Sequence, residues 1–145
     1  RHVMIRKHGS ARWQGNLREG QGTLATESGA VRDQGYSFAR RFGGEAGTNP
    51  EELIGAAHAA CFAMAMSVGL EKAGLVADSI DARSTVTLET KPSGAEITQV
   101  HLEVTAAIPG ATEEQFQRIA EETKAGCPVS KLLAGARITM SARLA

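Results

Sequence analysis

Two cysteines stand where a thiol could do chemistry. Cys61 lies in GTNPEELIGAAHAACFAMAMSVGLEKAG (residues 47–74) and Cys127 in AGCPVSKLL (residues 125–133). Taken alone, Cys61 fits a small core residue, the commonest place for a free cysteine. Cys127 precedes Pro128 and would cap a short helix, where unpaired N–H groups favour a thiolate, although a cysteine that merely starts a turn fits equally well. In a chain that can fold without disulfides, two distant cysteines indicate reactive thiols rather than a structural disulfide.

The segment around Cys61 is expected to be helical. His58 stands three residues before Cys61 and would therefore lie on a neighbouring surface of that helix. It could lower the pKa of the thiol or share a hydrogen-bond network with it. A lone histidine on an alanine-rich helix also fits a hydrogen-bonded core or interface residue. Together with Cys127, these residues could supply three zinc ligands, but no CxxC motif or second histidine with finger spacing accompanies them. We therefore expect no metal and no cofactor.

Charged residues flank the start of this helix. Glu52 follows Asn49 at the spacing of a capping box, and Glu51 benefits from the helix dipole, so both have a structural explanation. Arg40 and Arg41 end the segment YSFARRF, which we expect to be a strand that points them to opposite faces. An arginine that turned inward would need a carboxylate partner, and Glu51 is close in sequence.

The elements that must position these residues follow from the local patterns. Asn49 and Pro50 predict a helix start and Gly74 a stop, which gives a helix of roughly two dozen residues. Thr112 and Gln115 form a capping-box pattern, and that second helix should end at Gly126. The expected strands are ARWQGNL, GTLATES and GYSFARRF in a small antiparallel sheet, STVTLET and VHLEVTAAI in a hairpin joined by KPSG, and ARITMSARL after a helical turn in CPVSKLLAG.

Size and composition narrow the class of protein. The 145 residues fit one domain of α+β class, and 16 Lys and Arg balance 16 Asp and Glu, so no basic surface points to nucleic acid or anionic lipid. No apolar leader precedes Met4, so we expect a cytoplasmic protein whose native chain starts there, with residues 1–3 foreign to it. The apolar run of residues 53–70 is interrupted by His58 and should fall short of a membrane span. Because the helix is apolar nearly all round, it should be buried on most faces, partly by a second copy in a homodimer.

At the level of longer segments, RFGGEAGTNPEELIGAAHAACF and KAGCPVSKLL resemble the signature segments of the OsmC/Ohr family, and ARWQGNLREGQGTLATESG resembles the N-terminal strands of its OsmC branch. The resemblance covers Met4 to Ala145. It implies a single peroxidase domain over residues 4–145. The implied fold is an OsmC/Ohr-like α+β fold, in which antiparallel sheets pack around a long central helix in an intertwined homodimer with its sites at the subunit interface.

The same resemblance implies a function. It indicates a thiol-dependent peroxidase that reduces organic hydroperoxides to alcohols in oxidative and osmotic stress defence, with a lipoyl-type dithiol as reductant. It assigns Cys61 as the attacking thiol and Cys127 as the resolving thiol, with Arg41 and Glu51 poising Cys61. Glu51 and Cys61 are ten residues apart on one helix, about 15 Å, so we expect the glutamate to come from the partner subunit. A thiol redox sensor or binding protein without turnover is the alternative.

Overall fold

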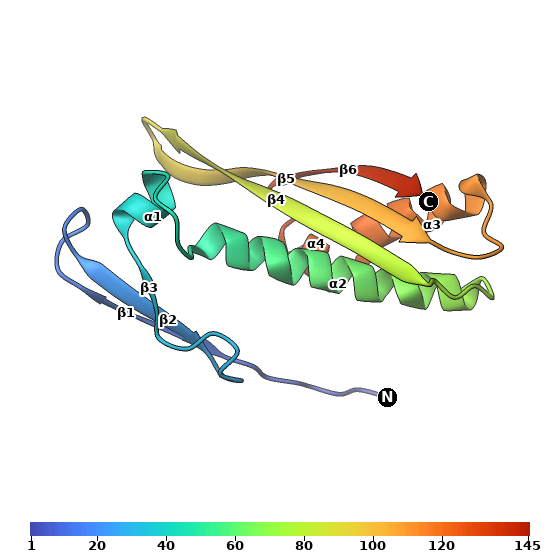
Figure 1. Ribbon diagram of the computed structural model, residues 1–145, viewed down its shortest axis with the longest axis horizontal. Coiled ribbons are helices and arrows are strands. Elements are labelled where there is room, and N and C mark those ends of the chain that lie inside the picture. Colours follow the sequence, from blue (N-terminus) through green and yellow to red (C-terminus); the bar gives the residue numbers. More distant parts are fainter. The chain divides into compact units, whose positions relative to one another are not determined.

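The first part of the chain is a small sheet followed by one helical turn. The computed structural model describes all 145 residues and divides into two compact units, Arg1–Pro50 and Glu51–Ala145 (Figure 1). In the first unit, the strands β1 (Gly9–Gln14), β2 (Gln21–Thr26) and β3 (Gln34–Tyr36) pair antiparallel in the order β1-β2-β3. The predicted small antiparallel sheet is therefore confirmed.

The third predicted strand of this sheet is too long. It ends at Tyr36, and the helix α1 (Phe38–Phe42) takes its place. The cause is Ser37, which has an extended backbone and accepts a hydrogen bond on Oγ from the backbone N–H of Arg40 at 3.2 Å, as an N-cap does. Arg40 and Arg41 are therefore neighbours on a helical turn, and the expectation that they face opposite sides of a strand was wrong.

The second unit contains one long helix and a three-stranded sheet. The helix α2 (Pro50–Lys72) ends just before Gly74, whose φ of 74° needs glycine, and confirms the predicted length. It is followed by β4 (Ser79–Lys91), β5 (Gly94–Ala107), α3 (Glu113–Gly126), α4 (Pro128–Leu132) and β6 (Arg137–Leu144). The capping box at the start of α3 is formed as predicted: Gln115 N–H donates to Thr112 Oγ1 at 3.1 Å, and Thr112 N–H donates to Gln115 Oε1 at 3.0 Å.

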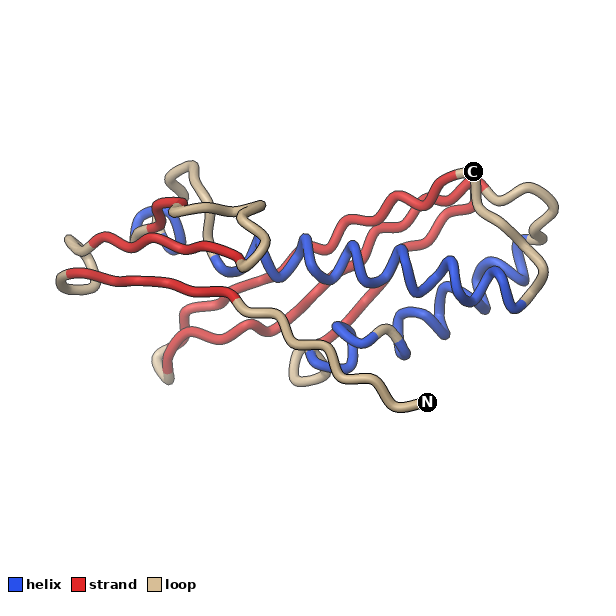
Figure 2. The backbone as a smooth tube through the Cα atoms, turned by 90° about the horizontal axis from the view of Figure 1, so that it is seen from below, coloured by secondary structure: helices blue, strands red, loops and turns tan.

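The sheet of the second unit is mixed rather than wholly antiparallel. β4 and β5 form the predicted hairpin, closed at Lys91 and Gly94, while β6 pairs with β5 in parallel. A parallel pair requires a crossover, and α3 with α4 provides it by carrying the chain back along the sheet (Figure 2). Cys127 lies within this crossover, between its two helices.

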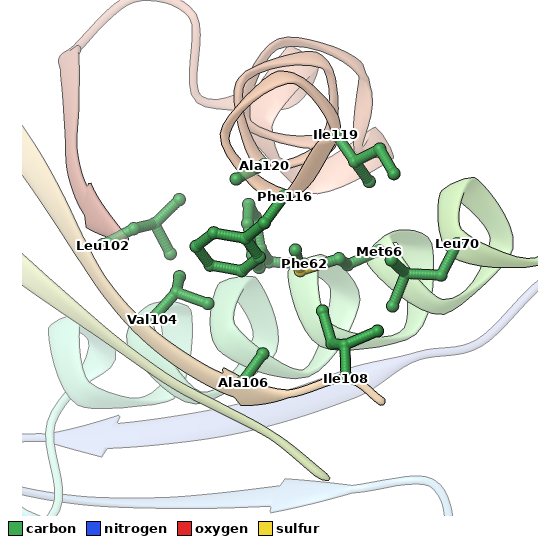
Figure 3. Packing of buried hydrophobic residues seen from close by; sticks show 10 residues of the cluster. All are labelled: Phe62, Met66, Leu70, Leu102, Val104, Ala106, Ile108, Phe116, Ile119 and Ala120. Carbon is green, nitrogen blue, oxygen red and sulfur yellow. The ribbon is translucent and has the colours of Figure 1, made fainter. Parts of the chain in front are cut away.

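The core of the second unit lies between α2, α3 and one face of β5. Its side chains recur every four residues on α2 and every second residue on β5, as a helix stripe and a strand face do (Figure 3). The buried cluster consists of Phe62, Met66 and Leu70 from α2, Leu102, Val104 and Ala106 from β5 with Ile108 just beyond it, and Phe116, Ile119 and Ala120 from α3.

Only one face of α2 is buried within the chain. Met64 is 73% exposed and Val68 is 47% exposed, so the expected burial on most faces is not achieved by a single copy. The helix also passes the test for a membrane span by length and composition, with a mean hydropathy of 1.7 over 18 residues, which the sequence reading did not expect. Of this 18-residue window, 28% is buried within the chain, and the buried part includes Phe62, Met66 and Leu70, which pack into the core of the second unit.

Candidate functional site

The two cysteines are neighbours in the second unit. Cys61 lies in the middle of α2 and is half-buried, and both thiols are free. Burial raises the pKa of the Cys61 thiol, as do a hydrogen bond and a charge interaction with Cys127, while a hydrogen bond with the backbone of Val129 lowers it. The fold thus brings together two thiols that the sequence separates by more than sixty positions.

Cys127 forms the junction between α3 and α4. It is 1% exposed, and its Sγ accepts a hydrogen bond from the backbone N–H of Ser130 at 3.3 Å, so the predicted N-cap position is confirmed. Pro128 suits the first helical position because the N–H that it lacks would have no partner there. The Sγ also donates to Ser130 Oγ at 3.2 Å. Ser130 therefore contacts the thiol through both its backbone and its side chain.

His58 connects this thiol to the sheet. The side chain is fully buried, with Nε2 2.8 Å from Ser130 Oγ and Nδ1 2.8 Å from Ser84 Oγ on β4. Burial lowers the pKa of the imidazole, so the ring is neutral at pH 7. Of the two interpretations left open for His58, the hydrogen-bonded core residue is the one observed, and its hydrogen bonds reach Cys127 through Ser130 rather than Cys61 directly.

Sequence reasoning missed both hydroxyl partners of His58. Ser130 had a local signal, because a residue three positions after an N-cap returns its N–H to the capping side chain. Ser84 had none, since it lies on a strand 26 positions away in sequence. It comes close to α2 because Gly55 has no side chain: a Cβ there would stand 2.6 Å from the carbonyl oxygen of Ser84.

Glu51 occupies the first turn of α2, far from Cys61 along the same helix. Its side chain is buried, at 9% exposure, on the face that also carries Gly55 and His58. The ten residues from Glu51 to Cys61 lie within one continuous helix, so the two are separated by about 15 Å along its axis. Glu51 is therefore not a neighbour of the thiol of its own chain.

The two arginines belong to the first unit and diverge there. The Arg41 guanidinium lies 5.2 Å from the centre of the Phe42 ring, at a cavity of about 260 Å³. Arg40 instead packs over Gly35 and Gly47, where any added Cβ would come within 3 Å of its side chain. Arg41 is thus the arginine that borders a cavity, which is lined further by Trp13, Leu17, Tyr36, Ser37 and Phe38.

Comparison with known proteins shows the family to which the chain is related. Residues 43–142 match the model of the family described as OsmC-like protein. The chain is 49% identical over 142 residues to Peroxiredoxin OsmC of Escherichia coli (strain K12), covering 98% of this chain and 99% of that protein. It is 31% identical over 121 residues to the organic hydroperoxide resistance protein of Xanthomonas axonopodis pv. citri (strain 306), covering 81% of each.

A solved structure shares the fold at low sequence identity. The OsmC-like protein from Mycoplasma pneumoniae superimposes with a TM-score of 0.73 at 15% identity, over 98% of this chain and 99% of that one. The resemblance noted in the signature segments is therefore confirmed along the whole chain, in sequence and in fold. The chain belongs to the family of OsmC-like proteins.

Proposed function

We propose that this protein is a cysteine-based peroxidase that reduces organic hydroperoxides to alcohols, with Cys61 as the attacking thiol and Cys127 as the resolving thiol. The observation that carries the proposal is the juxtaposition of the two free thiols, one half-buried and one buried. The names of the two relatives, a peroxiredoxin and an organic hydroperoxide resistance protein, support a role in defence against peroxides.

The reaction has three balanced steps. The Cys61 thiolate attacks the terminal oxygen of ROOH, the O–O bond breaks, and the alkoxide takes a proton to leave as ROH, with a sulfenic acid on Cys61. The sulfur of Cys127 then attacks the Cys61 sulfur, which forms the disulfide and releases water. An external dithiol reduces the disulfide, and we propose a lipoyl-type dithiol in this role.

A cation is needed at the first step. Burial and the neighbouring Cys127 raise the pKa of Cys61, so within the second unit alone the thiol is a poor source of thiolate. We assign this cation to Arg41, which would also stabilise the charge that develops on the departing oxygen. Glu51, too far from Cys61 of its own chain, would orient the arginine at the site of the partner subunit.

The exposed side of α2 supports a homodimer. Ala57, Ala60, Met64 and Val68 form an apolar stripe on this side, named here the α2 stripe, and a second copy would cover it. The assembled protein would be a cytoplasmic dimer of single peroxidase domains spanning residues 4–145. Each site would combine the thiols of one subunit with Glu51 of the other.

Replacing each cysteine in turn tests the assignment. With one equivalent of tert-butyl hydroperoxide, Cys61→Ser should consume none, and Cys127→Ser should form a sulfenic acid on Cys61 and then stop. The wild type should form an intrachain disulfide and turn over with dihydrolipoamide. A sulfenic acid on Cys127 in the Cys61→Ser variant would reverse the two roles. A wild type that forms the disulfide once but does not turn over with any dithiol would be a redox sensor.

A further inference from the structure

The peroxidase reaction as proposed gives no role to His58, which is a buried polar side chain. His58 is fully buried beside an apolar core, and each of its ring nitrogens is 2.8 Å from a serine hydroxyl. Burying an imidazole costs free energy that its hydrogen bonds only offset, and an apolar side chain would fill the same space without that cost. The histidine is also only one serine away from the thiol that must lose its proton during resolution.

We propose that Ser130 and His58 form a proton relay that activates Cys127 for attack on the Cys61 sulfenic acid. The inference rests on the proposed peroxidase function and deepens it. Ser130 is the catalytic residue, because its hydroxyl contacts the reacting sulfur, and His58 is a positioning residue that acts through Ser130. Ser84 holds the far side of the imidazole ring.

The distances define a continuous path for the proton. Cys127 Sγ donates to Ser130 Oγ at 3.2 Å, and Ser130 Oγ is 2.8 Å from His58 Nε2. When Nδ1–H donates to Ser84 Oγ, at 2.8 Å, Nε2 is left as an acceptor for the Ser130 hydroxyl. The neutral ring, kept so by the burial that lowers its pKa, is the form that can accept a proton.

The burial of Cys127 makes such a path necessary. A solvent-exposed thiol can transfer its proton to water, but Cys127 is 1% exposed, Ser130 is 2% exposed and His58 is fully buried. The hydroxyl of Ser130 is the acceptor that the fold places on this thiol. A resolving thiolate must therefore form within the protein, and general-base assistance of this kind contributes about 10²–10⁴-fold to a rate.

The step balances in protons and electrons. The Cys127 S–H proton moves to Ser130 Oγ while the Ser130 hydroxyl proton moves to His58 Nε2. The electron pair left on Cys127 forms the bond to the Cys61 sulfur, and the S–O bond of the sulfenic acid breaks with its electrons on oxygen. The hydroxide takes up one proton from solvent and leaves as water, and His58 afterwards releases the proton that it gained, so no net proton is consumed. Cys127 is oxidised and the sulfenic sulfur of Cys61 is reduced, both to the disulfide level.

Variants that separate hydrogen bonding from proton acceptance test the relay. His58→Gln keeps a donor and an acceptor in place but cannot become a cation, and Ser130→Ala removes the hydroxyl that Ser130→Thr retains. Rapid mixing with one equivalent of tert-butyl hydroperoxide follows two separate steps: sulfenic acid formation on Cys61, trapped with a sulfenic-selective reagent, and disulfide formation, measured by intact mass. His101→Gln is the matched control, because His101 is half-buried and bonded to the hydroxyl of Thr139 outside this network.

Disulfide formation should slow by about 10²-fold in His58→Gln and Ser130→Ala, while sulfenic acid formation stays near the wild-type rate. Ser130→Thr should recover most of the loss, and His101→Gln should show none. If His58→Gln fails to fold, the Ser130→Ala and Ser130→Thr pair carries the test. Disulfide formation at the wild-type rate in Ser130→Ala would overturn the relay. A wild type that forms no sulfenic acid at all would instead overturn the proposed peroxidase function.

Discussion

The two compact units differ in how much they bury. Across residues 1–50, Gly22 is the one residue that is buried, and the sheet β1-β2-β3 leaves most of its side chains half-buried or exposed. The second unit buries a continuous apolar cluster and encloses a polar network beside it. The thiols thus belong to a unit with an apolar core of its own, whereas Arg41 belongs to a unit without one.

The largest effect should come from the core of the second unit. Phe62→Ala removes a fully buried ring at the centre of the cluster and should lower the free energy of unfolding by about 3–5 kcal/mol. Trp13→Ala in the first unit removes a half-buried ring whose centre lies 5.5 Å from the centre of the Tyr36 ring. This substitution should lower the free energy of unfolding by about 1 kcal/mol. Urea unfolding measures both. Equal losses would show that the first sheet is as well packed as the core.

The next largest effect should be kinetic and come from the first unit. Arg41→Ala should slow sulfenic acid formation on Cys61 by about 10²–10³-fold, the usual loss when a group that stabilises developing negative charge is removed. Arg40→Ala is the matched control, since that side chain packs over Gly35 and Gly47, and it should change the rate little. Single-turnover consumption of tert-butyl hydroperoxide gives the rate. A larger loss in Arg40→Ala would exchange the assignments of the two arginines.

The smallest effect should be a pH dependence confined to the second unit. The pKa of His58 is lowered by burial, so the unfolded chain binds a proton more readily than the folded one once the pH falls below about 6.5. The stability that neutral His58 contributes is fully present above that pH and is lost as the pH falls toward the lower folded pKa. Unfolding free energies measured between pH 7 and pH 5 should therefore fall less steeply in His58→Gln than in the wild type.

One of the two histidines of the first unit, His8, provides the contrast for this measurement. Its side chain is 72% exposed and lies 2.8 Å from Glu27, so His8→Gln is the control substitution outside the core of the second unit. If the unfolding free energy of His58→Gln falls with pH as steeply as that of the wild type, the pKa of His58 does not differ between the folded and unfolded chain.

Local signals predicted the elements well where a single residue type decides the geometry. The start of α3 at Thr112 and the end of α2 before Gly74 follow from capping preferences alone, and both were correct. The strand expected through Phe42 failed because Ser37 was read as a strand residue rather than as an N-cap. The parallel pairing of β6 depends on where the crossover returns the chain, which no local pattern encodes.

The sequence supplied the candidate residues of the site but not the contacts between them. Cys61, Cys127 and His58 were identified by residue type and spacing, and the family resemblance paired the two thiols. The contact of His58 with Ser84 depends on the close approach of β4 to α2 at Gly55, which is a property of packing. The placement of Arg41 at the thiol and of Glu51 in the partner's site stays a prediction.

The crossover between β5 and β6 has a consequence for the order of events during synthesis of the chain. Cys127 lies in the connection between two parallel strands, directly after α3, and α3 packs against β6, which pairs with the edge of β5. A nascent chain that has emerged through Leu132 carries both cysteines but still lacks β6. Peroxide that reaches such a chain would meet Cys61 before its resolving partner is in place, so newly made molecules should be the ones most open to irreversible oxidation.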